Sequence, residues 1–305
     1  MGEERITFNA EGLTIAGVVR VPDGVKPGEL RPGFMVLHGF GSTMNAGNVL
    51  APCAMFEKLG YVTLRFDMPG CGDSEGEKGR LICLDQVATT SAALTWLAQH
   101  PNVDPVRIAA IGSSFGAAVA VYAGGADQRI AAVISSGGWG HGERKFRGQH
   151  PTPEAWAKFT AMLDEGRKHR ARTGTSLMVP RYDIVPIPAH LRGHLVERSV
   201  QMFPAETAQS MFDFRAEDVV GNIAPRPLLL LHSSSDSVTP VEQSMSLFAR
   251  AGQPTELHLF ADTDHFMFAE GNTRVRHVVL DWLERYFPAT GVVDSSEQTR
   301  HHALR

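Results

Sequence analysis

The sequence has little of what marks secreted, metal-binding or membrane proteins. Its 305 residues include only three cysteines, Cys53, Cys71 and Cys83, with no Cys-x-x-Cys pair. Such an odd and sparse set provides neither a disulfide framework nor a cysteine zinc site. The longest apolar runs, such as 227–231, are far shorter than the ~20 residues that cross a bilayer. We therefore expect no insertion into a membrane.

The N-terminal residues also lack targeting signals. No apolar stretch typical of a secretory signal follows Met1, and Ile6 stands where a myristoylation motif needs Ser or Thr. The formal net charge is only −4, which gives no reason to expect a nucleic acid or an anionic membrane as a partner. We expect a cytoplasmic protein on these grounds.

Cofactor motifs are missing as well. The sequence contains no Walker A, H-E-x-x-H or EF-hand pattern. Gly70 and Gly72 form a G-x-G after an expected strand, but the next glycine, Gly76, comes one position too late for a dinucleotide fingerprint. No helix is expected to open directly on this loop. The sequence therefore indicates neither a cofactor nor a metal.

The most informative stretch that is present spans residues 107–125. It predicts a short buried strand, then the turn Gly112-Ser-Ser-Phe-Gly116, then a helix of small residues. This is the G-x-S-x-G pattern of a nucleophile elbow. Ser114 should stand exposed at the apex, above a helix N-terminus that favours a developing anion. A plain turn built from Gly and Ser is the alternative interpretation.

Strands and helices alternate along most of the chain. We expect buried strands at 33–38, 61–66, 107–111, 130–135, 227–232 and 255–260, and helices at 48–59, 84–99, 115–123, 241–251 and 273–286. This order predicts an α/β fold with a doubly wound, mostly parallel sheet, whose antiparallel part is an opening hairpin within residues 5–21.

The alternation stops between residues 138 and 215, which are polar, basic and rich in aromatic side chains. We interpret them as an inserted helical cap over the carboxyl ends of the strands, where such sheets bind ligands. The expected organisation is a first part of the core at 1–137, the cap at 138–215, a second part of the core at 216–288 and a C-terminal tail at 289–305.

With the elbow in this context, residues 10–287 resemble an esterase-like serine hydrolase of the α/β-hydrolase family. In that family the acid and the histidine follow the serine in the sequence, each after a late strand. The resemblance implies Asp236 as the acid and His265 as the base. Asp262 and Asp264 are rival acids, although a neighbour of the base in sequence rarely faces its ring. Capping of the next helix is the alternative role for Asp236.

The stretch His38-Gly-Phe-Gly41 resembles the family's oxyanion loop. The resemblance implies that the backbone N–H groups of Phe40 and Phe115 bind the oxyanion. A plain glycine turn after a strand is the alternative. Loop 67–74 resembles a structural loop of the same family, and Cys71 within it is expected to be a packing residue.

The expected activity is cleavage of carboxylic esters through an acyl-enzyme, with Ser114, His265 and Asp236 as the triad. Small to medium apolar esters are the expected substrates, and monoesters that carry a carboxylate remain open. The same triad would also serve an amide, a thioester, a lactone or a C–C bond beside a ketone. A hydrolase-fold binding protein without catalysis is the third alternative, and a homodimer is left open.

The cap carries a net positive charge. Between His141 and Arg198, 11 Lys and Arg residues face six acids, a balance of +5 against −9 for the rest of the chain. A basic cap would favour substrates with a carboxylate, whereas a solvated helix face is the alternative for the cations at 167–172. Trp139 closely follows the strand at 130–135 and is the aromatic residue that we expect in the substrate pocket.

Overall fold

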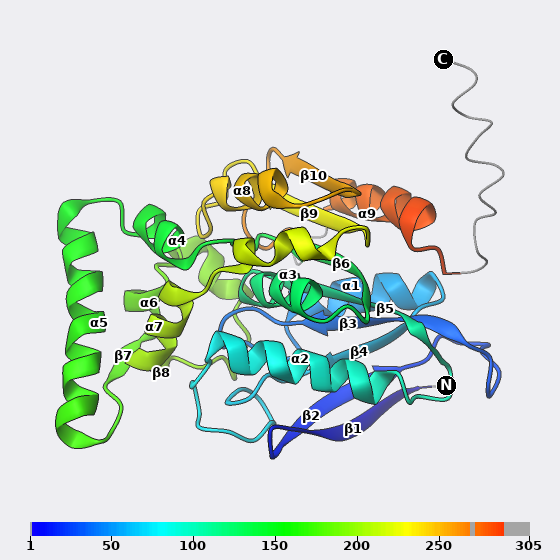
Figure 1. The fold of residues 1–305 in the computed structure, drawn as a ribbon, viewed down its shortest axis with the longest axis horizontal. Helices are drawn as coiled ribbons and strands as arrows, with labels where there is room; N and C mark the ends of the chain where they lie inside the picture. The colour runs from blue at the N-terminus through cyan, green and yellow to red at the C-terminus, as the bar shows by residue number, and fades with distance from the viewer. Residues whose placement is uncertain (1, 269–271, 290–305) are drawn as a thin grey trace.

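A computed structural model describes residues 2–268 and 272–289. Its main sheet has eight strands in the order β1-β2-β4-β3-β5-β6-β9-β10 (Figure 1). Their bounds are Glu3–Ala10 (β1), Leu13–Arg20 (β2), Arg31–Leu37 (β3), Val62–Phe66 (β4), Val103–Ser113 (β5), Ile130–Ser136 (β6), Leu228–Ser233 (β9) and Thr255–Phe260 (β10). Strand β2 pairs antiparallel with β1 and β4, and the other pairs are parallel. The doubly wound, mostly parallel sheet with an antiparallel opening hairpin is thereby confirmed.

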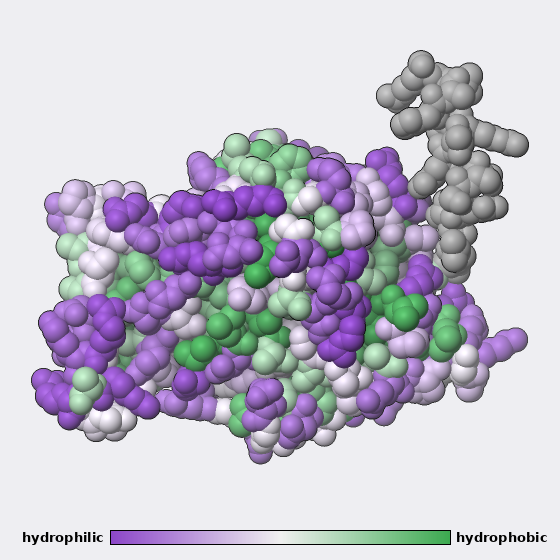
Figure 2. Space-filling view, viewed as in Figure 1, coloured by the Kyte–Doolittle hydropathy of each residue, from purple (hydrophilic) through white to green (hydrophobic). Residues whose placement is uncertain are grey.

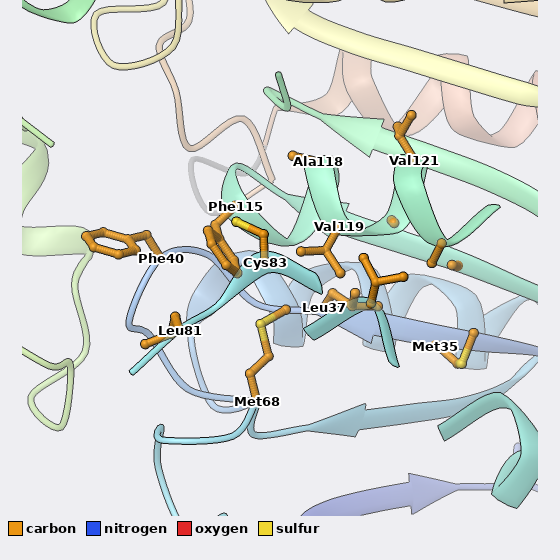
Figure 3. Close-up of a cluster of buried hydrophobic side chains, with 14 of the residues drawn as sticks. Met35, Leu37, Phe40, Met68, Leu81, Cys83, Phe115, Ala118, Val119 and Val121 are labelled. Atoms are coloured by element: carbon orange, nitrogen blue, oxygen red, sulfur yellow. The ribbon is translucent and has the colours of Figure 1, made fainter. Parts of the chain in front are cut away.

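Helices cover both faces of this sheet. One face packs against α1 (Gly47–Lys58) and α9 (Thr273–Tyr286), and the other against α2 (Cys83–Leu97), α3 (Phe115–Ala126) and α8 (Glu242–Arg250). Successive strand residues alternate between the two layers, because side chains in a strand point to opposite faces. Figure 3 shows Met35 and Leu37 of β3 in the layer that also contains Val119 of α3. Burial on both faces explains why these strands are continuously apolar.

Strand β5 is longer than the sequence predicts. It starts at Val103, which pairs with Arg31, and the register with β3 then shifts before Gly33 pairs with Ile108. Pro105 lies in the skipped stretch and has no N–H to give to a ladder. The proline hid the start of the strand, although the chain still pairs before it.

The residues between β6 and β9 include a set of elements at one end of the main sheet (Figure 1). We call residues 138–215 the inserted segment. It contains α4 (Gly142–Gln149), α5 (Pro153–Thr173), β7 (Met178–Pro180), α6 (Arg181–Ile184), the 3-10 helix η1 (Ala189–His194), β8 (Met202–Pro204) and α7 (Ala205–Asp213). Strands β7 and β8 pair antiparallel. Two 3-10 helices, η2 (Ala216–Asp218) and η3 (Val220–Ile223), then lead back to β9.

Two further observations concern the C-terminal tail and the ability of the helices to cross a membrane. The tail expected at 289–305 lies outside the described residues, apart from Ala289. In the part that the structure describes, no helix combines the length and the apolar character needed to cross a bilayer.

One charged residue is buried within the inserted segment. Lys145 of α4 is only 2% exposed, and its Nζ has no hydrogen-bond partner among the described residues. The amine lies 4.6 Å from the centre of the Trp139 ring and 3.9 Å from that of Phe146. Burial in these apolar surroundings lowers the pKa of Lys145 to about 7.

Replacement of Lys145 by Met should stabilise the protein at neutral pH. Between pH 7 and 10.5 the unfolded chain holds a proton on Lys145 that the folded chain has lost, so wild-type stability rises with pH in this window. The shift corresponds to at most about 5 kcal/mol. We expect Lys145→Met to raise the free energy of unfolding at pH 7 by about 2–4 kcal/mol, and the gain to shrink toward pH 10. Urea unfolding at both pH values measures this, and a variant less stable than wild type at pH 7 would contradict it.

Candidate active site

Ser114 occupies the sharp turn between β5 and α3. Its backbone has φ 56° and ψ −114°, a conformation that non-glycine residues rarely adopt. Its N–H donates to the carbonyl of Ser136 at 2.8 Å, which ties the turn to the end of β6. Strain of this kind persists only where the surroundings fix it, and such strain is concentrated at functional sites.

The two glycines of the turn are required by close backbone contacts. A Cβ at Gly112 would lie 2.1 Å from the carbonyl carbon of Gly116. A Cβ at Gly116 would lie 2.5 Å from the carbonyl oxygen of His38 and 2.6 Å from that of Leu37. Because these neighbours are backbone atoms, they cannot move aside as a flexible side chain would. The glycine pattern read from the sequence therefore reflects the close approach of β3, β5 and α3.

Asp236 and His265 meet on the loops that follow β9 and β10. Nδ1 of His265 lies 2.8 Å from Oδ2 and 3.0 Å from Oδ1 of Asp236, and both side chains are almost completely buried. Oδ1 of Asp236 also accepts from the N–H groups of Val238 at 2.8 Å and Thr239 at 2.7 Å. The carboxylate is therefore positioned to orient the imidazole ring.

A second histidine, which no sequence pattern indicates as functional, contacts the same carboxylate. Nε2 of His232, at the end of β9, is 3.4 Å from Oδ2 of Asp236 and 2.9 Å from the carbonyl of Thr239. Burial alone would raise the pKa of Asp236, but His265 and His232 outweigh it and hold that pKa below its usual range. Asp236 thus remains ionised beside the ring.

The rival acid Asp264 has different partners. Its Oδ1 accepts from the backbone N–H of His265 at 2.8 Å and from that of Ser237 at 2.8 Å, and its Oδ2 accepts from the Ser237 hydroxyl at 2.8 Å. The carboxylate therefore connects the two loops rather than contacting the ring of His265. Asp262, the other rival, has a left-handed backbone with φ 56°.

Ser114 and His265 line one small cavity of about 30 Å³. Phe40 and Gly39 from the loop after β3 line it too. The inserted segment contributes a further part of the wall, with Arg181, Val185, Ile187, His194 and Leu195. Such a volume holds about one or two water molecules. Residues of the inserted segment thus line the same cavity as Ser114, and this cavity is too small for an ester substrate.

The two expected oxyanion donors are free in the described structure. Neither the N–H of Phe40 nor that of Phe115 donates to an acceptor among the described residues. Phe115 is the first residue of α3, where a helix leaves its N–H groups without an intrahelical partner. The positive end of the helix adds to the attraction of an anion at this point.

Trp139 lies outside the cavity. It is 1% exposed, and its ring centre lies 5.8 Å from that of Phe115 and 6.5 Å from that of Phe214. It is not one of the residues that line the space beside Ser114. The expected substrate contact is therefore not supported, because the chain after β6 turns into the core below the cavity. The sequence places Trp139 just after a strand but does not show whether its side chain points into the cavity or into the core.

The cations of the inserted segment lie mainly at the surface. In α5, Lys168 pairs with Asp164 at 2.5 Å and Arg172 with Glu165 at 3.9 Å, and all four side chains are exposed. Figure 2 shows hydrophilic side chains over much of the surface that α5 forms. The solvated-face interpretation of residues 167–172 is therefore favoured over a basic lining of the site.

The structure also bears on metal and thiol chemistry. Within residues 2–268 and 272–289, no group of three or more His, Cys, Asp or Glu side chains is arranged to hold a metal ion. Cys53, Cys71 and Cys83 are free and buried, and burial raises the pKa of each thiol to about 12. These thiols are packing groups rather than nucleophiles.

The fold and this arrangement define an α/β hydrolase. The family model described as serine aminopeptidase, S33, matches residues 28–272. The chain therefore belongs to this family of α/β hydrolases.

Curated relatives cover almost the whole chain. The chain is 27% identical over 294 residues to an uncharacterized 31.7 kDa protein from the traX-finO intergenic region of Escherichia coli, which covers 92% of this chain and 99% of the relative. It is 24% identical over 285 residues to the thiohydrolase aneE of Aspergillus aculeatus, with coverage of 86% and 87%.

Solved structures share the fold. The hypothetical protein PA2218 from Pseudomonas aeruginosa gives a TM-score of 0.81 at 22% identity and covers 94% of each chain. Est1E from Butyrivibrio proteoclasticus with bound ferulic acid gives 0.64 at 17% identity and covers 92% of this chain and all of the other. The chain is thus an α/β-family hydrolase with esterase and thiohydrolase neighbours.

Replacement of Asp236 by Asn should lower kcat by about 10³–10⁴-fold, because the amide no longer holds the proton on Nδ1 of His265. Asp264→Asn is the matched control, since it changes a neighbouring carboxylate that does not contact the ring. We expect it to lower kcat by less than about tenfold. Steady-state hydrolysis of an activated ester compares the two, and equal losses would contradict the assignment of Asp236.

Proposed function

We propose that this protein is a serine hydrolase that cleaves carboxylic esters through an acyl-enzyme. The observation that carries the proposal is the convergence of three loops: the strained Ser114 turn and His265 line one cavity, and Asp236 is bonded to the far nitrogen of the His265 ring. These are the positions that a nucleophile, a base and an orienting acid require.

In the proposed mechanism the serine oxygen attacks the acyl carbon while Nε2 of His265 takes the hydroxyl proton. Asp236 stabilises the imidazolium that forms. The carbonyl oxygen becomes an oxyanion, which accepts hydrogen bonds from the N–H groups of Phe40 and Phe115. His265 then returns the proton to the leaving alcohol, and the acyl-enzyme remains on Ser114.

The second half of the reaction repeats these roles with water. His265 takes a proton from the attacking water, the same two N–H groups bind the second oxyanion, and the released Ser114 regains its proton.

The apolar side chains of the cavity wall favour a substrate with an apolar acyl or alcohol group. Val185, Ile187, Leu195, Val238 and Phe266 contribute apolar side chains beside Ser114. Apolar walls with a few placed polar groups are typical of small-molecule sites. Because the cavity is too small for an ester, the residues of the inserted segment that line it must move when substrate enters.

A thioester is the second candidate substrate. It passes through an oxyanion at the same place, so the triad accepts either bond. The relative named thiohydrolase, aligned over most of both chains, supports it. An ester and a thioester with the same acyl group separate the two possibilities.

The first test is turnover of p-nitrophenyl esters from acetate to decanoate, of matched thioesters and of one carboxylate-bearing ester. We expect turnover by wild type, and Ser114→Ala should lower kcat by at least about 10³-fold. A fluorophosphonate should label wild type and leave Ser114→Ala unlabelled.

The outcomes of this test are distinct. A higher kcat/KM for thioesters would make the protein a thiohydrolase. Labelling of Ser114 without turnover of any ester or thioester would point to an amide, a lactone or a C–C bond. Absence of both labelling and turnover would exclude the enzyme and leave a hydrolase-fold binding protein.

A further inference from the structure

Arg181 connects the inserted segment to the loop that carries Phe40. It is the first residue of α6 and is 1% exposed. Its Nη1 donates to the carbonyl of Phe40 at 2.8 Å, and its Nη2 donates to the carbonyl of Gly41 at 2.9 Å. Its Nε donates to the carbonyl of Val200 at 2.8 Å, which anchors the guanidinium within the inserted segment.

This burial of charge is costly for stability. Among the described residues, Arg181 has no carboxylate partner, and its three hydrogen-bond acceptors are backbone carbonyls. Burial lowers the pKa of Arg181 to about 10, and the group remains charged at neutral pH. An unpaired buried charge costs free energy that an apolar side chain would not. The arrangement calls for a role other than packing.

The guanidinium has the shape that the loop requires. It is planar and carries several N–H donors, and two of its nitrogens donate to two successive carbonyls. The rings of Phe40 and Phe203 stack with centres 4.2 Å apart, and the guanidinium carbon lies 5.3 Å from each centre. A lysine at this position has a single nitrogen and reaches these carbonyls less well.

The bonds of Arg181 complete the fixation of the peptide planes around Phe40. The preceding carbonyl, that of Gly39, accepts from Nδ1 of His38 at 2.8 Å and from the N–H of Ser42 at 3.1 Å. The following carbonyl, that of Phe40 itself, accepts from Arg181. Both planes that flank the Phe40 Cα are therefore held, and the first of them carries the free N–H.

We propose that Arg181 is a positioning residue, which holds the loop 39–41 so that the N–H of Phe40 is preorganised for the oxyanion. The inserted segment then completes the oxyanion hole as well as covering it. This inference rests on the proposed function, since it assigns the N–H of Phe40 to the transition state. Preorganised donors stabilise the charge that develops in the reaction without reorganising when it forms.

The test compares Arg181→Lys and Arg181→Gln with wild type in two measurements. The first is the second-order rate constant for labelling of Ser114 by a fluorophosphonate, whose phosphonyl oxygen occupies the oxyanion position. The second is kcat and KM for the best p-nitrophenyl ester. We expect both variants to label and turn over about 10²-fold more slowly, with KM changed less than threefold, because the loss of one donor lowers kcat by about 10²–10³-fold.

A merely structural role would give a different pattern. A fraction that stays unfolded during the assay lowers the labelled fraction and leaves the rate constant unchanged. A fraction that refolds rapidly lowers the rate constant only in proportion to the folded population, so a variant that is mostly folded cannot show a loss of about 10²-fold for this reason. The matched control is Asp183→Asn, which removes an exposed ion pair with Lys158 from the same short helix. This control should keep wild-type rate constants.

Each of the other outcomes overturns the proposal. Wild-type rate constants in Arg181→Gln would show that the loop does not need the guanidinium. Full activity in Arg181→Lys would show that a positive charge is sufficient and that the two guanidinium nitrogens are not required. An increase in KM confined to carboxylate-bearing esters would make Arg181 a substrate-recognition residue. Absence of labelling in wild type would instead overturn the proposed function itself.

Discussion

The close approach of three backbone segments at the turn after β5 is the constraint on which the site depends. Gly116 packs against the carbonyls at the end of β3, and Gly112 packs against Gly116. This contact leaves Ser114 in a left-handed conformation at the end of the sheet and places the first N–H of α3 beside it. A side chain at Gly116 would separate β3 from α3, and one at Gly112 would separate β5 from α3. Either change would displace the two expected oxyanion donors, because Phe40 follows β3 and Phe115 is the first residue of α3.

Buried electrostatics determine how the other loops meet this turn. Asp236 is buried, and two histidines and two backbone N–H groups keep it ionised, so it holds His265 strongly. Asp264 ties the same two loops together through Ser237. One carboxylate therefore faces the ring while the other shapes the loop that presents it. The division of roles follows from which groups donate to each carboxylate.

The inserted segment is bonded to the loop that follows β3. Its Arg181 and the N–H of Val200 supply hydrogen bonds to the carbonyls of Phe40 and Gly41. Arg181 thus lines the cavity beside Ser114 and also bonds the loop after β3. In the proposed function, this coupling would let movement of the segment on substrate entry change the geometry of the oxyanion hole.

The sequence by itself determined the sheet, its helices and the positions of the candidate triad, because these depend on local patterns. The alternation of apolar strands with helices can be followed along the sequence. The two glycines around Ser114 indicate a turn at which backbone segments come close together. Asp236 and His265 follow late strands, and parallel strands bring their carboxyl ends together. The paired acids and cations of α5 were likewise consistent with a solvated helix.

Only the tertiary structure decided where the side chains of Trp139, Lys145 and Arg181 lie. Trp139 was expected in the pocket and lies in the core, and the two cations were counted with a basic cap but are buried. Burial of a residue in the segment 138–215 depends on contacts with elements far away in sequence, such as the loop after β3 for Arg181. Neither periodicity nor composition encodes those contacts, since a charged side chain reads as exposed until its neighbours are known.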